Sequence, residues 1–237
     1  MSNVFNFPTF TYFEEPEPHI IIDNLLPEKL AEECLNEAIE LEPFYEDARV
    51  GPHLSPDHKC DECKPYINYV KHGIRDNSVI YLDTLFKGKR FESKILDIIQ
   101  RTFLSEQIQN RISKFPSVFP ILNQVTHSES ILSRYGMCDF YGWHTDTFIE
   151  KLADRVITFC YYMNKEPETF EGGEIVFADK NFENIKSIKP KHNRAVLFLS
   201  HSTFHCVNKV KLNGDFSQGR FSLNYWLGFG TDNYKMR

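Results

Sequence analysis

The segment FYGWHTDTF, residues 140–148, places His144 and Asp146 two positions apart. Alternate residues of a β-strand lie on one face, so the imidazole and the carboxylate would point the same way. Side chains placed like this can fill two adjacent positions on one metal ion. A second histidine would complete the 2-His-1-carboxylate set that suits non-haem Fe(II) and oxygen chemistry. The alternative is a hydrogen-bonded core histidine beside a turn aspartate, and so short a pattern arises often by chance.

The third ligand should come from a distant strand, and the C-terminal half offers two candidates. The segment RAVLFLSHSTFHCVNKV, residues 194–210, is typical of an apolar strand, a short turn and a second strand. This segment contains His201 and His205. The residues alone leave both histidines open.

The segment GRFSLNYWLGF, residues 219–229, predicts a strand with two different faces. It alternates Arg220, Ser222 and Asn224 on one face with Phe221, Leu223 and Tyr225 on the other. We expect Arg220 to point inward, where an unpaired guanidinium is costly. Its partner is either the carboxylate of a bound ligand, held through parallel hydrogen bonds, or an internal carboxylate such as Asp146.

Several motifs follow one another between Gln124 and Gly228. They are RYGMCDFYGWHTD (134–146), RVITFCYYMN (155–164), FEGGEIVF (170–177), PKHNRAVLF (190–198), FHCV (204–207) and GRFS (219–222). In this order they resemble the Fe(II)- and 2-oxoglutarate-dependent dioxygenases, specifically their prolyl-4-hydroxylase-like branch. An isolated HxD is a weak signal, whereas the ordered set is highly specific and favours a metal site at His144 and Asp146.

The resemblance implies that His144, Asp146 and His205 are the catalytic iron ligands. It selects His205 over His201 because the distal histidine of this family opens a strand in an H-x-V context, which His205 and Val207 match.

The resemblance also implies a cosubstrate pocket. Arg220 would hold the C5 carboxylate of 2-oxoglutarate, with Ser222 beside it in the family's R-x-S pattern, and Tyr162 would donate to the same carboxylate. Strand alternation agrees, because it places Thr158, Cys160 and Tyr162 on one face of the strand expected at 155–163. Tyr135 and Tyr141 precede the HxD as tyrosines often do in this branch. They are candidate cosubstrate or substrate contacts, and aromatic core packing is their alternative.

The implied activity is decarboxylation of 2-oxoglutarate with O2 to succinate and CO2, coupled to hydroxylation of a substrate C–H bond. Fe(II), 2-oxoglutarate and O2 would be required, and ascorbate is a candidate reductant. The substrate would be a peptidyl proline, an amino acid or another small molecule. Two alternatives stay open: a nucleic-acid demethylase of the same superfamily, and a non-enzymatic jelly-roll binding module.

The elements that must position these residues divide the chain into two regions. Helical periodicity at 27–42 and 92–104 predicts two helices. From residue 119 onward we expect strands at 119–126, 129–135, 138–145, 155–163, 174–178, 186–189, 195–200, 205–211 and 220–228. The expected fold is mainly β with N-terminal helices (α+β) around a double-stranded β-helix, or jelly-roll, core. Residues 1–118 would support the core at 119–237 within one structural domain.

The segment 42–78 has no convincing periodicity, so we expect a mobile lid or substrate-contact segment there. Its Cys60 and Cys63 form a C-x2-C pair, but structural zinc normally needs a second pair of ligands, so loop cysteines are favoured. The pair Gly172 and Gly173 suggests a strand entry with unusual backbone angles and no chemistry.

The composition favours a globular intracellular protein. Of 237 residues, 41% are hydrophobic, and the net charge is −6 without a basic stripe, which argues against nucleic-acid or membrane-surface binding. No apolar run is long enough to span a membrane. The first residues show no signal-peptide pattern, and six cysteines in that context point to reduced thiols in the cytoplasm.

Overall fold

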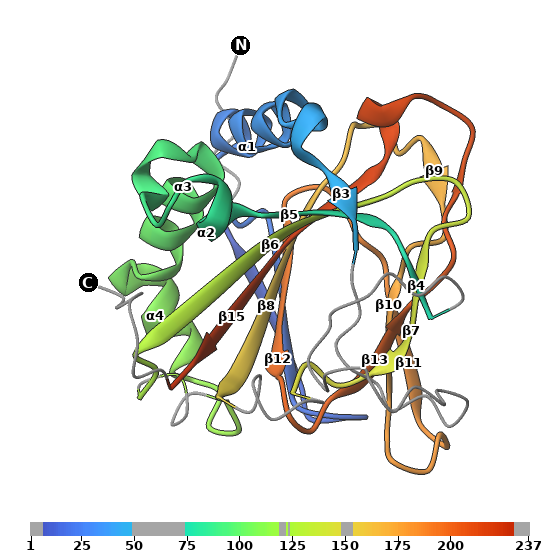
Figure 1. Ribbon diagram of the computed structural model, residues 1–237. Coiled ribbons are helices and arrows are strands. Elements are labelled where there is room, and N and C mark those ends of the chain that lie inside the picture. The colour runs from blue at the N-terminus through green and yellow to red at the C-terminus, as the bar shows by residue number, and fades with distance from the viewer. Residues whose placement is uncertain (1–6, 49–73, 119–121, 123, 148–153, 230–237) are drawn as a thin grey trace, which may run out of the picture.

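The computed structural model describes residues 7–48, 74–118, 122, 124–147 and 154–229. Within them, two antiparallel sheets face each other, as Figure 1 shows. The large sheet has eight strands in the order β1-β2-β12-β8-β15-β6-β5-β3, and the small sheet has five in the order β11-β10-β13-β7-β4. A short pair, β14-β9, lies apart from both.

The strands are β1 (Thr9–Phe13), β2 (His19–Asp23), β3 (Glu46–Asp47), β4 (Arg75–Asp76), β5 (Ser78–Tyr81), β6 (His127–Tyr135), β7 (Phe140–His144), β8 (Arg155–Met163), β9 (Phe170–Glu171), β10 (Ile175–Ala178), β11 (Ile185–Ile188), β12 (Arg194–Leu199), β13 (Phe204–Val207), β14 (Lys211–Leu212) and β15 (Arg220–Gly228). The helices are α1 (Glu28–Glu40), α2 (Leu82–Leu85), α3 (Lys94–Phe103) and α4 (Glu106–Ile112), with short 3-10 turns η1 (Glu42–Phe44), η2 (Arg90–Glu92) and η4 (Phe216–Gln218).

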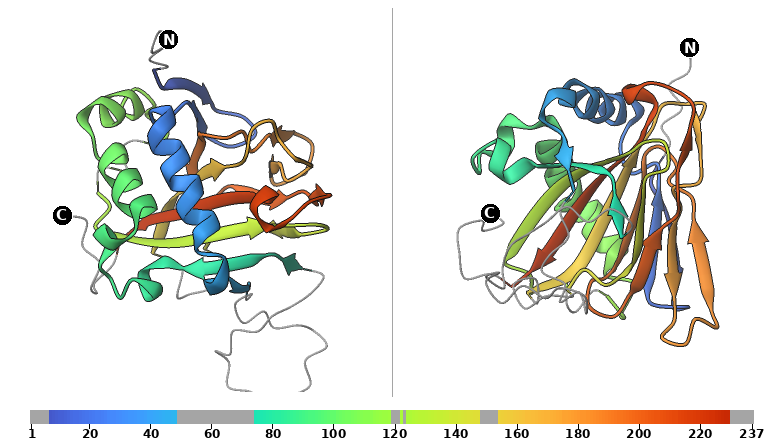
Figure 2. Two further views of the ribbon diagram at one scale, coloured as in Figure 1. Left: turned by 90° about the horizontal axis from the view of Figure 1, so that it is seen from above. Right: turned by 45° about the vertical axis from the view of Figure 1, so that its right-hand side comes forward.

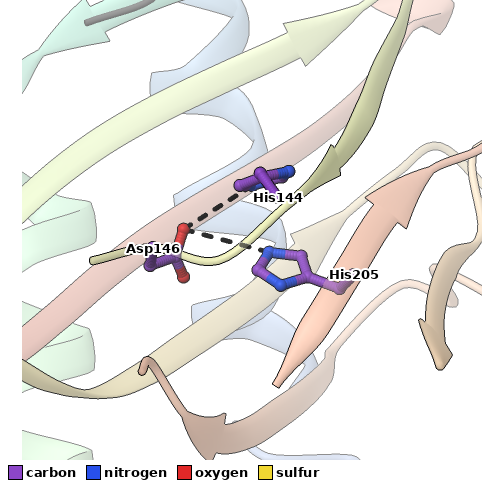
Figure 3. Close-up of side chains that lie close together, drawn as sticks. All are labelled: His144, Asp146 and His205. Atoms are coloured by element: carbon purple, nitrogen blue, oxygen red, sulfur yellow. Dashed lines mark ion pairs between the residues drawn. The ribbon is translucent and has the colours of Figure 1, made fainter. Parts of the chain in front are cut away.

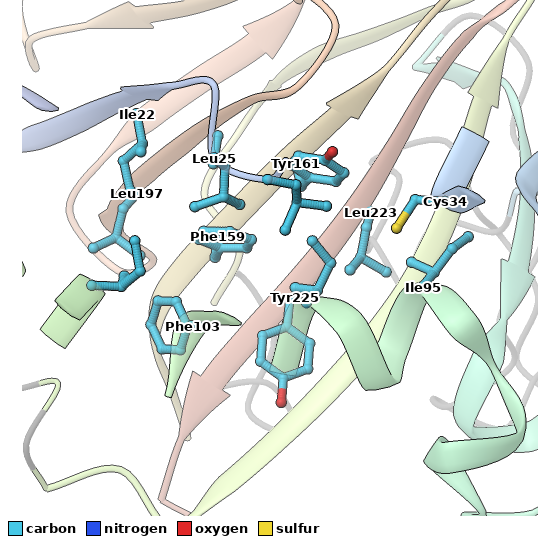
Figure 4. Close-up of a cluster of buried hydrophobic side chains, with 14 of the residues drawn as sticks. Ile22, Leu25, Cys34, Ile95, Phe103, Phe159, Tyr161, Leu197, Leu223 and Tyr225 are labelled. Carbon is cyan, nitrogen blue, oxygen red and sulfur yellow. The ribbon is translucent and has the colours of Figure 1, made fainter. Parts of the chain in front are cut away.

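The large sheet carries a different core on each face. Its outer face packs against the helices in one extensive hydrophobic cluster, part of which Figure 4 shows. The two views of Figure 2 agree that the helices lie on the side of this sheet away from the small sheet. Its inner face meets the small sheet through a smaller cluster, which includes Cys160 and Tyr162 of β8 and Phe177 of β10.

A buried carboxylate joins the two main helices. Glu37 of α1 accepts hydrogen bonds from Ser93 Oγ (3.2 Å) and from the backbone N–H groups of Lys94 (3.0 Å) and Ile95 (2.6 Å). These groups stand at the start of α3, where N–H groups lack partners within the helix. Negative charge is also favoured there by the helix dipole. Glu37 therefore fixes the start of α3 against α1, and both helices pack against the large sheet.

The structure confirms both predicted helices and most predicted strands of the C-terminal half. The strand expected at 119–126 is wrong for the residues described there, because Leu122 is helical and Gln124 lies in a turn. Strands β1, β2 and β5 were not predicted, and they pair into the large sheet beside β12 and β6. The N-terminal region thus contributes strands as well as helices. The apolar run HIIID of β2 was the available signal.

Most of the segment 42–78, for which we expect mobility, lies outside the described residues. Cys60 and Cys63 both lie in that part. Only the two ends of the segment are described. The first contains η1 and β3, and the second contains β4 and the first residue of β5. Strand β3 belongs to the large sheet and β4 to the small sheet. Among the helices of the described residues, none combines the length and the hydropathy needed to cross a membrane.

Candidate metal centre

Three side chains from different parts of the chain converge between the two sheets, as shown in Figure 3. The ligand atoms of His144, Asp146 and His205 all lie within 4.8 Å of one another. Asp146 Oδ1 is 3.7 Å from His144 Nε2 and 3.9 Å from His205 Nε2. His144 ends β7, Asp146 follows in a turn, and His205 stands opposite His144 on β13. The pairing of β7 with β13 therefore brings the distant histidine to the HxD.

Both imidazoles are held in the same way. His144 Nδ1 lies 2.8 Å from the carbonyl oxygen of Gly142, and His205 Nδ1 lies 2.9 Å from that of Thr203. A carbonyl only accepts, so each Nδ1 carries the proton and donates it. In the neutral form of an imidazole held this way, Nε2 keeps its lone pair. Both Nε2 atoms face Asp146. This orientation of histidines by a backbone carbonyl is typical of metal ligands.

A β-bulge in β7 shapes this edge of the site. Between the pairs Tyr141–Val207 and His144–His205, β7 contains one residue more than β13. The extra residue breaks the simple alternation, and the ring of Tyr141 consequently stacks on the imidazole of His144, with centroids 3.6 Å apart and planes 19° apart. Gly142 stands inside the bulge, where its N–H donates to the carbonyl of Ile74 at 2.8 Å.

The electrostatics of the cluster favour cation binding. Burial, followed by the proximity of His205, lowers the pKa of His144 to about 3, so its imidazole is neutral at pH 7. Burial opposes ionisation of Asp146, yet His205, His144 and a hydrogen bond from Thr158 together hold the pKa of Asp146 below its usual range. Neutral imidazoles and an ionised carboxylate are the protonation states that bind a divalent metal. The donor set fits Fe(II).

A buried arginine lies on the same inner face of the large sheet. Arg220 donates from Nε to the carbonyl of Gly173 (3.1 Å) and from Nη1 to Ser222 Oγ (3.0 Å). Its guanidinium lies over the rings of Tyr135 (4.6 Å) and Tyr162 (4.8 Å). None of the described carboxylates forms an ion pair with it, so the alternative of a salt bridge to Asp146 is not realised.

Tyr162 is one of the two tyrosines beside Arg220, and its hydroxyl is the most informative atom of this group. It is fully buried and has no hydrogen-bond partner among the described residues. Burial raises the pKa of Tyr162, so the phenol keeps its proton and acts as a donor. A buried donor without an acceptor costs roughly 1–3 kcal/mol. Among the described residues, the guanidinium has no carboxylate partner and the neighbouring phenol has no acceptor, so the two groups together could bind an anion.

The structure thus groups the residues singled out in the sequence into two neighbouring sets. His144, Asp146 and His205 form a cluster that could hold a metal ion, and His201 is exposed. Ser222 accepts a hydrogen bond from Arg220, and the rings of Tyr135 and Tyr162 lie against its guanidinium. The alternation expected on β8 also holds, because Thr158, Cys160 and Tyr162 share the inner face.

Two contributions were missed in the sequence. Gly172 and Gly173 have φ values of +80° and +71°, as expected, but the Gly173 carbonyl also holds Arg220. Arg75 of β4, buried and bonded to Asn77 Oδ1 at 2.7 Å, lies with its guanidinium 4.6 Å from the ring centroid of Tyr141. Arg75 belongs to the segment 42–78, which has no periodicity, so its sequence context did not predict that it would lie beside Tyr141.

Comparisons with known proteins agree with this geometry. Residues 130–228 match the family model of the 2OG-Fe(II) oxygenase superfamily. An uncharacterized PKHD-type hydroxylase of Synechocystis sp. is 31% identical over 137 residues, which cover 52% of this chain and 45% of the relative. A PKHD-type hydroxylase of Synechococcus sp. is 31% identical over 114 residues, covering 47% of this chain and 49% of the relative. The chain spans about half the length of these curated relatives.

Solved structures share the fold at lower sequence identity. A Pseudomonas putida prolyl-4-hydroxylase aligns with a TM-score of 0.62 at 17% identity, covering 90% of this chain and 92% of that one. A Trichoplax adhaerens prolyl hydroxylase in complex with a hypoxia inducible factor peptide gives 0.62 at 16% identity, covering 89% and 83%. The segment that matches the family model carries the HxD, the distal histidine and Arg220, so this part of the chain is similar to the 2OG-Fe(II) oxygenase superfamily, and the chain has a prolyl-4-hydroxylase-like fold.

Proposed function

We propose that this protein is an Fe(II)- and 2-oxoglutarate-dependent oxygenase that hydroxylates a substrate C–H bond and releases succinate and CO2. The observation that carries the proposal is the adjacency of two sites on one inner face. A buried His-Asp-His cluster lies beside a buried arginine and tyrosine that lack an anionic partner among the described residues.

The roles follow from the orientation of each group. His144, Asp146 and His205 would hold the iron through the two Nε2 atoms and a carboxylate oxygen. Bound there, Fe(II) supplies the activation of O2 that this reaction class requires. Enclosure between the sheets excludes water from the reacting groups. Ascorbate remains a candidate reductant.

Arg220 and Tyr162 would anchor the cosubstrate. The guanidinium fork suits a carboxylate, and the Tyr162 hydroxyl can donate a further hydrogen bond to it. Ser222 and the Gly173 carbonyl hold two of the guanidinium nitrogens, so the arginine is oriented before the ligand arrives. The rings of Tyr135 and Tyr162 lie close to its guanidinium, with centroids 4.6 Å and 4.8 Å from Cζ. This preorganisation lowers the entropic cost of binding.

The same proposal includes the finer fold description. The two facing antiparallel sheets support a double-stranded β-helix core in residues 119–237. Residues 1–118 support that core within one structural domain, which the pairing of β2 with β12 and of β5 with β6 favours. The described cysteines are free thiols, which is in keeping with a cytoplasmic location.

The first experiment tests the cosubstrate pocket. Anaerobic Fe(II)-protein titrated with 2-oxoglutarate should develop a metal-to-ligand absorption band. Arg220→Ala should weaken this binding by about 30-fold to several thousand-fold, because removal of one partner of a buried charge pair costs roughly 2–5 kcal/mol. Arg220→Lys should fall between, since it keeps the charge and loses the fork. Iron affinity should change little. Unaltered 2-oxoglutarate affinity in Arg220→Ala would remove Arg220 as the anchor.

The second experiment addresses the substrate. Because solved proteins of this fold include prolyl hydroxylases, proline-containing peptides are the first panel, followed by amino acids and small metabolites. Succinate release and a gain of one oxygen by mass spectrometry identify a substrate. Iron uptake with no consumption of 2-oxoglutarate in any condition would instead support a binding module.

A further inference from the structure

The two carboxylate oxygens of Asp146 have different surroundings. Oδ1 is the atom that faces both histidines, at 3.7 Å from His144 Nε2 and 3.9 Å from His205 Nε2. Oδ2 accepts a hydrogen bond from the hydroxyl of Thr158 at 2.5 Å. A contact this short between a hydroxyl and a carboxylate is typical of a strong, charge-assisted hydrogen bond. One oxygen is therefore free toward the histidines, and the other is engaged.

The Thr158 hydroxyl is itself held by Ser200. Their two oxygens lie 2.8 Å apart. A threonine hydroxyl has one proton, and Thr158 uses it for Asp146, so Ser200 must be the donor to Thr158. The carbonyl of Ser200 also accepts from the backbone N–H of Asp146 at 3.1 Å. The result is a directional chain from Ser200 through Thr158 to Asp146 Oδ2.

The fold places this chain where water does not compete. Thr158 is 1% exposed and Ser200 is fully buried, while Asp146 is 8% exposed. Thr158 lies on β8 opposite Phe198 of β12, and Ser200 follows directly after β12. The two hydroxyls therefore come from neighbouring strands of the large sheet, whereas Asp146 comes from the turn after β7 on the small sheet. The hydrogen bonds join the two sheets at the site.

We propose that Thr158 is a positioning residue for the metal centre, with Ser200 as its support. By engaging Oδ2, it leaves Oδ1 as the single carboxylate oxygen directed at the position between the two imidazoles. A carboxylate that offers one oxygen occupies one coordination position and leaves room for cosubstrate and O2. This inference rests on the proposed function, because it assigns His144, Asp146 and His205 to a metal.

Titration with Co(II), whose visible absorption bands report coordination geometry, tests the inference without turnover. Thr158→Val removes the hydroxyl at nearly constant volume and should weaken Co(II) binding by roughly 10- to 100-fold, the range typical of outer-shell hydrogen bonds to metal ligands. It should also change the band shape, because Oδ2 becomes available to the metal. Thr158→Ser keeps the hydroxyl and should bind within about threefold of the parent protein. Ser200→Ala should give a smaller loss than Thr158→Val.

Ser133→Ala provides the matched control. Ser133 is fully buried, and its hydroxyl has no partner among the described residues. Its removal should leave the Co(II) affinity unchanged. Thermal unfolding of the metal-free variants shows whether a loss of affinity reflects a loss of fold, and the inference expects metal-free Thr158→Val to unfold within a few degrees of the parent.

The outcomes separate this inference from the proposed function. Equal Co(II) affinity and identical spectra in parent, Thr158→Val and Ser200→Ala would overturn the positioning role and leave the metal site intact. An equal loss in Ser133→Ala would also overturn it, because the effect would then be general. A parent protein that binds neither Co(II) nor Fe(II) would overturn the metal site and the inference with it.

Discussion

Strands β8 and β15 have two faces of opposite character, although they belong to the same sheet. On the face toward the helices, Phe159 and Leu223 join the large core, and the tyrosine hydroxyls there have partners. Tyr161 donates to Asn193 Oδ1 at 3.1 Å, and Tyr225 to Ser128 Oγ at 3.0 Å. On the face toward the small sheet, the hydroxyl of Tyr162 is equally buried and has no described partner.

This difference separates stability from chemistry within single strands. Polar atoms buried for stability are satisfied inside the protein, because an unmatched one costs free energy. A polar atom buried without a partner carries that cost unless a ligand supplies the missing contact. The face toward the helices therefore stabilises the fold through apolar packing. The inner face carries the unpartnered Tyr162 hydroxyl and the Arg220 guanidinium, which could bind an anion.

The largest expected effect breaks the inner face at the metal. His205→Ala removes one of the three converging side chains that would hold the metal, so iron-dependent turnover should be lost while the β-rich fold remains, because the apolar face is untouched. His201→Ala is the matched control, since His201 is exposed and only four positions away in sequence. Circular dichroism and succinate release measure both properties. Full turnover in His205→Ala together with loss in His201→Ala would reverse the assignment.

The opposite face should respond in the opposite way. Phe159→Ala removes a fully buried ring that packs against Phe103 of α3, with centroids 5.2 Å apart. Such a truncation typically costs about 3–5 kcal/mol of unfolding free energy. Denaturant titration measures this loss. In the remaining folded protein, the affinity for 2-oxoglutarate should stay near that of the parent. A selective loss of that affinity at unchanged stability would contradict the division between the two faces.

The sequence predicted this division where strands are regular. Strict alternation placed Thr158 and Tyr162 on one face of β8 and turned Arg220 inward on β15, and the structure has both arrangements. Period-two alternation is set by local backbone geometry, so it can be identified without knowledge of neighbouring strands.

Prediction failed where the geometry depends on pairing. The bulge in β7 brings Tyr141 onto His144, and a bulge is defined only by the partner strand. Arg75 reaches Tyr141 because β4 pairs with β7, and nothing in its own segment indicates that edge. The choice of His205 over His201 rested on family resemblance, since either histidine fits the strand pattern.

A third prediction concerns an unmatched polar atom that lies away from the site. His19 of β2 is fully buried against Phe13 and Phe177, and its Nε2 has no described partner. Burial lowers the pKa of His19 to about 4. The neutral form is favoured in the fold, so this stability is present above the unfolded pKa near 6.5 and is lost as pH falls toward 4. The loss should reach roughly 3 kcal/mol.

His19→Phe tests this because it removes the titrating group and keeps an aromatic ring. Unfolding free energies measured between pH 4 and 7 should fall more steeply for the parent than for the variant. Replacement of the exposed His201 by Gln should preserve the parental slope. Identical slopes for the parent and His19→Phe would show that burial does not suppress the protonation of His19.

The smallest expected effect isolates the atom on which the comparison rests. Tyr162→Phe deletes one buried hydroxyl and leaves the ring that packs on Arg220. If the hydroxyl waits for a carboxylate, its loss should weaken 2-oxoglutarate binding by about 1–2 kcal/mol, the typical value for one hydrogen bond to a charged group. The unfolding free energy without cosubstrate should stay the same or rise, because an unmatched buried donor has been removed.

Tyr161→Phe on the opposite face is the matched control. It breaks the hydrogen bond to Asn193, so it should lower the unfolding free energy by about 1 kcal/mol and leave cosubstrate affinity unchanged. Equal effects of the two substitutions on both measurements would mean that the faces do not differ as proposed.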